Sequence, residues 1–442
     1  MKKIKLIDIA DINSKTFTIN DFDEILYLDT SSVTKGVFED FVRFSKDDTI
    51  PSRAKRAIKD KTIVYSTVRP NLQHFGIFEY PQENIVVSTG FATIDVKDNL
   101  VDPKYLYYNL TQDNYTNALH TIATNNVSSY PSINPSDLEN LELKIPKDKK
   151  TQTAIARVLS SLDEKIEINN KINRELENLA KTIYDYWFVQ NADKGWEKKK
   201  LEEIGDFKNG VNYEKANTIG EKIKIINVRD ISMSSMFINV ENLDEIVLSK
   251  KETEKYSLDE NDIIFARSGV PGETRLIEKT EENIIFCGFS IRFRLYDKEL
   301  KPYLFFTLKQ NDKMTKKKSG GSIMPNISQD SLKDISITIP TTAILNKFNK
   351  TVSPIFSEII ERRKESAYLA QLRDFLLPLM MNGQVTVKDI KDNTDMVIPF
   401  KNQDNYYQRF NMWLQNKKIA ARGETDLQTL REIFNAMDDD DK

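Results

Sequence analysis

The sequence predicts an α+β protein built from a duplicated unit, in which each copy is a globular block followed by one long helix. Two observations support this. Two long amphipathic segments, roughly residues 149–187 and 342–379, carry apolar seams that superimpose position for position, with Ile155 matching Phe348 193 residues later. Short sequence blocks that precede the two segments also recur in the same order, which is strong evidence of duplication. At 442 residues the chain is long enough for two to four domains.

The two seams follow the 3,4 spacing of a coiled coil. The first contains Ile155, Leu159, Leu162, Ile166, Leu176, Leu179 and Ile183, and the second contains Phe348, Val352, Ile355, Ile359, Leu369, Leu372 and Leu376. Polar residues interrupt both seams at matching places: Asn169 and Asn173 in the first, Arg362 and Ser366 in the second. A buried polar seam residue costs stability but fixes register and partner.

The repeated blocks alternate strand-like runs, turns and one short helix. In the first copy they are strands at 61–68 and 83–96, a helix at 102–110 with Pro103 in its first turn, a polar loop at 124–132 and a strand at 141–146. In the second copy they are residues 262–270, 282–295, 301–308, 316–328 and 335–340. The match includes a Gly-Phe pair, Gly90-Phe91 in the first copy and Gly288-Phe289 in the second.

Composition excludes several classes of protein. The sequence has no apolar run near the ~18 residues of a membrane span and no apolar segment after its N-terminal lysines, so we expect no signal peptide and a cytoplasmic location. One cysteine, Cys287, rules out an internal disulfide and a thiolate zinc cluster. Two histidines, His74 and His120, leave little for metal ligation. The net charge of −3 excludes a globally basic surface but not local basic faces.

Enzyme motifs are weak or absent. Asp102-Pro103-Lys104-Tyr105 resembles the Asp-Pro-Pro-Tyr motif of amino-methyltransferases, but it lacks the second proline, and the matching block at 301–304 lacks the acid. There is no glycine-rich cofactor loop and no GxxxxGK[ST] phosphate loop. We predict a non-catalytic protein without a cofactor or metal, although a nuclease carboxylate cluster stays open among its 67 acidic residues.

Three stretches carry a resemblance to a known family. They are VYSTVRPN (64–71), the run from 145 to 188 with its Leu-Asp-x-Lys-Ile-Glu core and closing Trp-Phe, and LRDFLLPLMMNGQV (372–385). Together they resemble the specificity (S) subunit of type I restriction-modification systems, and residues 204–231 resemble the start of a target recognition domain of that family. The resemblance covers about residues 1–387. One departure is TTAILNKF (341–348), which lacks the usual Gln at the start of the second helix.

The resemblance implies an architecture and a set of partners. Two α+β target recognition domains (1–145 and 191–340) would be separated by two long helices (146–190 and 341–387) that form an antiparallel coiled coil with a pseudo-twofold internal repeat. Asn169 and Asn173 would then pair with Arg362 and Ser366 at mid-helix. The chain would bind double-stranded DNA, two methyltransferase (M) subunits and restriction (R) subunits, and would itself hold neither S-adenosylmethionine nor ATP.

The lengths fit this arrangement. A helix of about 40 residues is ~60 Å long, and half-sites one duplex turn apart have centres ~34–36 Å apart. Such a helix can hold two domains over successive groove faces. Because the two blocks differ in sequence, we expect them to read different halves of an asymmetric, bipartite target.

The candidate DNA-binding residues lie in turns and basic clusters. Arg69 and Asn71 follow a strand, and Arg267 and Ser268 hold the matching place in the second copy; Arg can bond guanine and Asn adenine. The other candidates are the basic cluster Arg53, Lys55 and Arg56, the strand pair Arg292 and Arg294, and the matched loops Asn125, Asn126, Ser128, Ser129, Tyr130 and Lys316, Lys317, Lys318, Ser319. The alternative for each is a solvated turn or surface charge.

Two questions stay open from the sequence. Residues 388–442 lie outside the resemblance, and their closing DDDDK is either a protease-site tag or an acidic, solvated terminus. As for function, the chain could serve a methylation-only or type IIB-like enzyme, or, as the rival class, be a coiled-coil protein scaffold that does not bind DNA. Salt-sensitive binding to duplex DNA would discriminate between the two classes.

Overall fold

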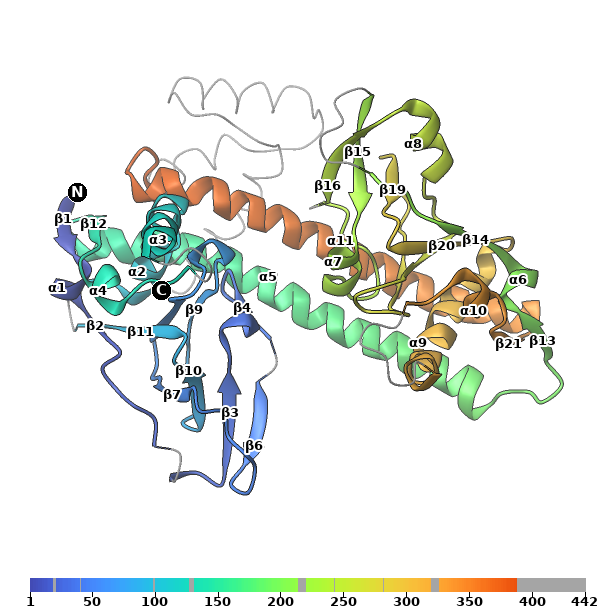
Figure 1. Ribbon diagram of the computed structural model, residues 1–442, viewed down its shortest axis with the longest axis horizontal. Coiled ribbons are helices and arrows are strands. Elements are labelled where there is room, and N and C mark those ends of the chain that lie inside the picture. The colour runs from blue at the N-terminus through green and yellow to red at the C-terminus, as the bar shows by residue number, and fades with distance from the viewer. Residues whose placement is uncertain are drawn as a thin grey trace, which may run out of the picture. The chain divides into compact units, whose positions relative to one another are not determined.

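The computed structural model describes residues 1–18, 21–39, 41–97, 100–126, 131–213, 220–241, 243–280, 282–318 and 326–387, without the side chains of 126 and 311–318 (Figure 1). The C-terminal extension from 388 onward lies outside these residues. The chain groups into two compact units. Unit 1 comprises Met1–Lys165 with Leu369–Lys442, and unit 2 comprises Ile166–Tyr368. Each unit therefore contains one globular block and a part of both long helices.

Unit 1 contains two four-stranded sheets and two short strand pairs. One sheet has the order β2 (Ala10–Ile12), β11 (Phe91–Val96), β8 (Ile63–Ser66), β9 (Phe75–Ile77). The other has the order β6 (Val42–Ser45), β3 (Glu24–Leu28), β10 (Ile85–Ser88), β7 (Ala54–Ala57). The pairs are β1 (Lys2–Lys5) with β12 (Glu142–Ile145) and β4 (Val33–Thr34) with β5 (Val37–Phe38). All four residues of β8 are buried, which explains its unbroken run of large side chains.

Short helices complete unit 1. They are α1 (Leu6–Ile9), α2 (Pro103–Leu110), α3 (Asp113–Asn126) and α4 (Pro135–Glu139), with 3-10 turns at Thr30–Ser32 and Pro70–Leu72. The Asp102 carboxylate accepts a hydrogen bond from the Tyr105 amide at 2.9 Å and caps α2, and Pro103 occupies the first helical position. Asp102, Pro103 and Tyr105 thus serve to begin a buried helix, which accounts for the methyltransferase-like motif without catalysis.

Unit 2 repeats the strand order of unit 1, except that its second sheet has no counterpart of β7 among the described residues. β13 (Glu197–Lys200) pairs with β21 (Ser336–Ile339), and the main sheet runs β14 (Gly205–Asn209), β20 (Ser290–Leu295), β17 (Asp262–Ala266), β18 (Thr274–Leu276). The second sheet runs β16 (Asp244–Leu248), β15 (Glu221–Ile226), β19 (Ile284–Phe286). The helices are α6 (Leu201–Ile204), α7 (Val228–Met233), α8 (Lys250–Tyr256), α9 (Lys301–Lys318) and α10 (Gln329–Lys333), with a 3-10 turn at Lys298–Leu300. The predicted α+β fold class is confirmed.

The two long helices are α5 (Lys149–Tyr184), which continues as a π-helical turn at Asp185–Gln190, and α11 (Thr342–Met381). Their seam residues are mostly buried. Ile155, Leu159, Leu162, Phe348, Val352, Ile359, Leu369, Leu372 and Leu376 are fully buried, while Ile166, Leu176, Ile183 and Ile355 are half-buried. Leu179 is 48% exposed, so its assignment to the seam was wrong. The alternation of three- and four-residue steps leads from Leu176 to Ala180, which is 0% exposed, so the seam passes through Ala180 instead.

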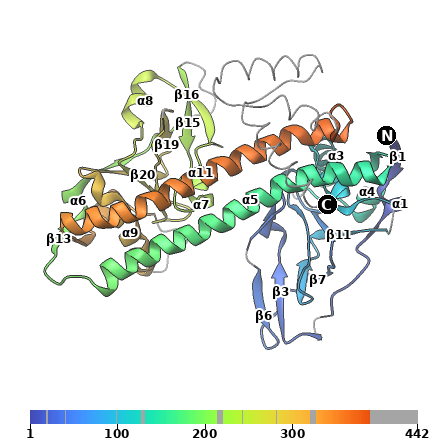
Figure 2. The same ribbon diagram turned by 180° about the vertical axis from the view of Figure 1, so that it is seen from behind.

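Within unit 2, the segments of α5 and α11 run side by side in opposite directions (Figure 2). Buried Asn169 donates to Glu365 Oε2 at 2.6 Å and accepts from Arg362 Nη1 at 3.3 Å, so the expected pairing of Asn169 with Arg362 is present. Asn173 instead donates to the Ile359 carbonyl at 3.3 Å. Ser366 is buried, and within the described residues its hydroxyl has no hydrogen-bond partner. Of the four polar seam residues expected to pair across the helices, Asn169 and Arg362 therefore do so through their side chains, and Asn173 and Ser366 do not.

Candidate nucleic-acid interface

In unit 1, four chain segments meet at the ends of β7, β8 and β11. The Thr89 amide donates to the Arg53 carbonyl at 2.8 Å, and the Thr67 amide donates to the Gly90 carbonyl at 2.8 Å. The Ile133 amide donates to the Thr67 carbonyl at 2.9 Å. We call this group, residues 53, 67–71, 89–90 and 131–133, the loop edge of unit 1. It brings together the basic cluster and the Arg69 turn, which lie apart in the sequence.

Arg69 has the left-handed backbone conformation, with φ of 47°. Its amide donates to the Pro131 carbonyl at 2.8 Å, and Val68 forms a β-bridge with Ser132. These contacts fix an exposed arginine at a turn, a conformation that non-glycine residues adopt rarely and that is concentrated at functional sites. Asn71 is exposed in the following 3-10 turn. Both side chains are presented at the loop edge.

The basic cluster divides by exposure. Arg53 and Lys55 are exposed, whereas Arg56 is half-buried. Asn125 is exposed near the end of α3, and the side chain of Asn126 is not described. Ser128, Ser129 and Tyr130 lie outside the described residues, between the end of α3 and Pro131. The described segments on both sides of these residues reach the loop edge, because the Pro131 carbonyl accepts a hydrogen bond from the Arg69 amide and α3 packs against the turn at 70–72.

Unit 2 contains the same backbone pattern. The Arg267 amide donates to the Phe289 carbonyl at 2.8 Å, and the Ile327 amide donates to the Arg267 carbonyl at 3.0 Å. Residues 267–269, 288–289 and 327 form the loop edge of unit 2. Arg267 and Ser268 are half-buried there. The side chains of Lys316, Lys317 and Lys318 are not described, and Ser319 lies outside the described residues.

Strand pairing corrects two sequence matches. Ser66 pairs with Phe91 in unit 1, and Ala266 pairs with Ser290 in unit 2. Arg267 therefore corresponds to Thr67 rather than to Arg69. Phe91 corresponds to Ser290, so the two Gly-Phe pairs are displaced by one residue. The consequence is large, because Phe91 is 0% exposed and Phe289 is 63% exposed. Sequence identity at the Gly-Phe pair concealed this exposed aromatic residue.

Arg292 and Arg294 lie on β20, outside the loop edge, and their guanidinium groups bind acids of the same unit. Buried Arg292 forms an ion pair with Asp206, and Arg294 donates to both carboxylate oxygens of Asp262 at 2.8 and 2.6 Å. Burial raises the pKa of Asp262, and the hydrogen bonds from Arg294 oppose that shift. Alternation correctly placed the two arginines on one face of β20, but that face is covered by these acids. Arg294 also lies at the end of β20 opposite the loop edge.

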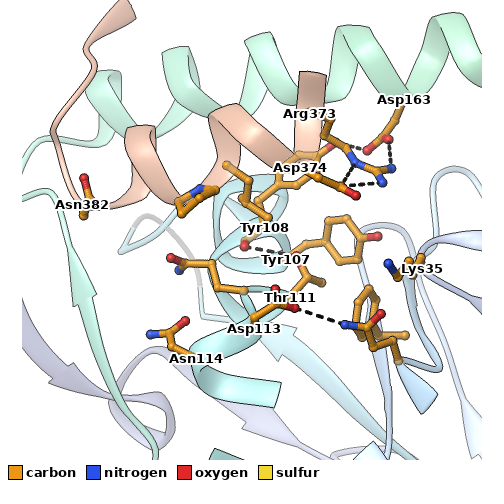
Figure 3. Close-up of a pocket in the computed structure, with 15 residues that line it drawn as sticks. Lys35, Tyr107, Tyr108, Thr111, Asp113, Asn114, Asp163, Arg373, Asp374 and Asn382 are labelled. Carbon is orange, nitrogen blue, oxygen red and sulfur yellow. Dashed lines mark hydrogen bonds and ion pairs between the residues drawn. The ribbon is translucent and has the colours of Figure 1, made fainter. Parts of the chain in front are cut away.

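A cavity of about 380 Å³ lies in unit 1 where α2 and α3 meet the end of α11 (Figure 3). Tyr107, Tyr108, Thr111 and Asp374 line it. At its wall Arg373 bonds Asp163 at 2.6 Å, and the Tyr108 hydroxyl donates to the other oxygen of Asp163 at 2.5 Å. Burial, followed by the Asp163 charge, raises the pKa of Tyr108.

Unit 2 has a cavity of about 680 Å³ lined by matching elements, namely α9 and the end of α5. Its lining residues Phe305, Phe306 and Lys309 stand where Tyr107, Tyr108 and Thr111 stand in unit 1, and Lys181 stands in place of Asp374. The two cavities thus share their position on the local framework, but they differ in charge and polarity.

The other candidates for chemistry have structural roles. Cys287 is buried as a small side chain in the core. His74 Nδ1 lies 2.7 Å from the Val33 carbonyl oxygen. Across the described ranges, no group of three His, Cys, Asp or Glu side chains could hold a metal ion. In the same ranges, no helix has both the length and the apolar character needed to cross a membrane.

Comparison with known proteins gives a consistent result. The family model of the type I restriction modification DNA specificity domain matches residues 1–178 and again 193–367. The HindI specificity subunit of Haemophilus influenzae is 25% identical, over 87% of this chain and 99% of its own length. The MjaIX specificity subunit of Methanocaldococcus jannaschii is 26% identical, over 77% of this chain and 84% of its own length.

A solved structure shares the fold. The type I restriction-modification S subunit from M. genitalium superimposes with a TM-score of 0.50 at 19% identity, covering 86% of this chain and 95% of that one. The two matches of the family model together span most of the chain and include both loop edges. This protein therefore belongs to the type I restriction modification DNA specificity family.

Proposed function

We propose that this chain is the DNA specificity subunit of a type I restriction-modification complex and reads a bipartite, asymmetric duplex target. The observation that carries the proposal is the pair of loop edges. Each is held by equivalent backbone hydrogen bonds, through the Thr67 peptide in unit 1 and the Arg267 peptide in unit 2. A common scaffold with different side chains fits two domains that read different half-sites by direct contact.

In this proposal, residues 1–145 and 191–340 are the two target recognition domains. α5 and α11 form an antiparallel coiled coil that relates the two copies by a pseudo-twofold axis and sets the gap between half-sites. The opposed contacts of Asn169 and Asn173 with α11 support this arrangement. The local twofold symmetry of duplex DNA can coincide with such an axis.

We further propose that Arg53, Lys55, Arg69 and Asn71 contact DNA from unit 1, and that Arg267 and Ser268 do so from unit 2. The remaining sequence candidates stay part of the proposal without a structural argument: Asn125, Asn126, Ser128, Ser129, Tyr130, Lys316, Lys317, Lys318 and Ser319. Arg69 is exposed at a fixed turn and Arg53 is exposed nearby, while Arg267 is half-buried; guanidinium groups suit phosphate or guanine contacts. Arg292 and Arg294 are not part of this proposal, because acids of the same domain already bind their guanidinium groups.

The proposed partners are two M subunits and, in a complete system, R subunits. One cavity lies beside the end of each long helix, at matching positions in the two units. Two such similarly placed surfaces support docking of a partner that is present in two copies. The chemistry of methylation and cleavage would belong to those partners, in the cytoplasm, and this chain would supply neither catalytic residues nor a cofactor.

An exchange of recognition domains tests the proposal. Replacing residues 191–340 with the corresponding block of another family member should change one half of the methylated sequence and leave the other half and the gap intact. The matched control replaces residues 1–145 and should change only the other half. If either exchange altered both halves, the assignment of one half-site to each domain would be wrong.

A further inference from the structure

Phe289 is a large apolar side chain in a position where solvent exposure is costly. It is 63% exposed, while Cys287, Gly288 and Ser290 around it are buried. A single exposed apolar residue needs no special explanation on its own. Phe289 is distinguished by its place, because it lies at the loop edge of unit 2 and its carbonyl binds the Arg267 amide.

The backbone that presents Phe289 is held on both sides. The Gly288 amide donates to the Val211 carbonyl at 2.7 Å, and the Ser290 amide donates to the Cys287 carbonyl at 2.9 Å. The Phe289 carbonyl itself accepts from the Arg267 amide at 2.8 Å. The ring is thus carried by a fixed turn next to Arg267. A preorganised side chain loses little entropy on binding.

The corresponding position in unit 1 carries no side chain. Gly90 occupies it, and a Cβ there would lie 2.7 Å from Thr30 Cγ2, so a larger residue would require Thr30 to shift. The aromatic residue is therefore a feature of the loop edge of unit 2 alone. Such a difference at otherwise equivalent positions is expected of a residue that distinguishes the two half-sites.

Resting on the proposed function, we propose that Phe289 is a specificity-determining residue that contacts the apolar surface of a nucleobase in the half-site read by unit 2. Duplex DNA offers this surface in two places. One is the 5-methyl group of thymine in the major groove. The other is the face of a base at a step that an apolar wedge has partly unstacked. The neighbouring Arg267 would contact a phosphate or a base edge beside it.

The test uses the complete specificity–methyltransferase complex and the target duplex defined by mapping its methylated sites. We expect Phe289→Ala to weaken binding about tenfold, within the range measured for loss of an aromatic contact to a base. Phe289→Tyr should bind within about twofold of wild type, since it keeps the ring. Tyr296→Ala is the matched control. Tyr296 is 70% exposed at the other end of β20, about 20 Å away by strand rise, and its loss should leave binding unchanged.

Two further arms separate the sources of the contact. If the ring touches a thymine methyl, replacing thymine by uracil in the half-site of unit 2 should reproduce the loss and abolish the effect of Phe289→Ala. If the ring is a wedge, 2-aminopurine at the contacted step should brighten on binding wild type but not the Ala variant. Wild-type binding without any change in Phe289→Ala would overturn the inference. An absence of salt-sensitive DNA binding by wild type would instead overturn the proposed function.

Discussion

At one matched site, beside α2 in unit 1 and α9 in unit 2, the two units use opposite chemistry. In unit 1, Asp163 of α5 and Arg373 of α11 form an ion pair to which Tyr108 adds a hydrogen bond. In unit 2, Phe356 of α11 matches Asp163 (193 residues later) and Ala180 of α5 matches Arg373 (193 residues earlier). Phe306 replaces Tyr108, and the ring centroids of Phe306 and Phe356 are 6.3 Å apart. The comparison shows that helix and domain can be joined equally well by a buried charge network or by apolar packing.

The two solutions should respond differently to single replacements. A buried ion pair contributes little net stability relative to apolar packing, but removal of one partner leaves an uncompensated charge. An apolar contact loses only the transferred surface and a cavity term. The network of unit 1 is thus the more fragile of the two without being the stronger.

The largest effect is expected from Arg373→Ala. Asp163 would remain charged at a mostly buried site, and we expect unit 1 to lose about 3 kcal/mol, the lower end for a broken buried pair because the Asp163 side chain is 31% exposed. Hydrogen exchange of the α2 amides measures the loss locally, which avoids treating a two-unit chain as two-state. Phe356→Ala is the counterpart in unit 2 and should cost less, about 2 kcal/mol for a half-buried ring. Equal or inverted losses would contradict the comparison.

Alkaline pH should weaken unit 1 more than unit 2. Burial raises the pKa of Tyr65 and of Tyr105 to about 12, and it raises the pKa of Tyr107 as well. An unfolded tyrosine ionises near 10, so the stability held by these groups is complete below pH 10 and falls as the pH rises toward 12. Unit 2 has Phe265 and Phe305 at the positions of Tyr65 and Tyr107, although burial also raises the pKa of its Tyr184 and Tyr303. Unit 2 therefore has fewer such groups at the matched positions.

The double variant Tyr65→Phe/Tyr107→Phe should therefore have a higher thermal midpoint at pH 11 than wild type. Each tyrosine replaced removes a loss of about 1 kcal/mol in folding free energy at that pH. At pH 8 the comparison isolates the loss of the Tyr65–Thr116 hydrogen bond, which should be small. An identical fall of the midpoint between pH 8 and 11 in both proteins would show that these tyrosines do not set the alkaline limit.

Replacing the charged network of unit 1 with the apolar side chains found in unit 2 should change the free energy of unfolding very little. The triple variant Asp163→Phe/Arg373→Ala/Tyr108→Phe copies unit 2, and we expect a free energy of unfolding within about 1 kcal/mol of wild type or higher. Comparison of the triple variant with the three single variants gives the coupling. A triple variant as weak as the single one would mean that the surrounding helices of unit 1 cannot accept the packing of unit 2.

The smallest change in stability is expected from Asn169→Leu, the mid-helix residue that bonds Arg362 and Glu365. A leucine suits the seam, so the protein should stay folded, but the two helices should lose their unique register. The measurement is the gap between methylated half-sites together with binding of the methyltransferase. An unchanged gap and unchanged binding would count against a role for Asn169 in specifying the pairing.

How far the sequence could predict this structure depended on the range of the interactions involved. The long helices, their polar interruptions and several of the strands follow from local periodicity, but Leu179 was misplaced and helix α3 was missed. The loop edges depend on backbone bonds such as Arg69 to Pro131, which join segments 62 residues apart and leave no local signal. The covering of Arg292 and Arg294 by Asp206 and Asp262 was hidden for the same reason, because alternation shows which side chains share a face but not what packs against it.

The exposure of Phe289 could not be predicted because the identical Gly-Phe pairs suggested that Phe289 corresponds to the buried Phe91. The Gly-Phe pairs align only if one residue is skipped, whereas the strand register of β11 and β20 requires no gap. A match of turn residues is therefore weaker evidence than a match of the strand that follows, because strands are fixed by pairing and turns tolerate a shift.

The central claim is that one chain with two different recognition domains gives a partner methyltransferase a split DNA target. The most direct test is to map methylated bases by single-molecule sequencing in cells that carry the methyltransferase gene with and without this gene. We expect a new adenine mark in a two-part motif with a fixed gap and unlike halves. No new mark, with the methyltransferase shown to be active and bound to this chain, would contradict it and favour the scaffold alternative.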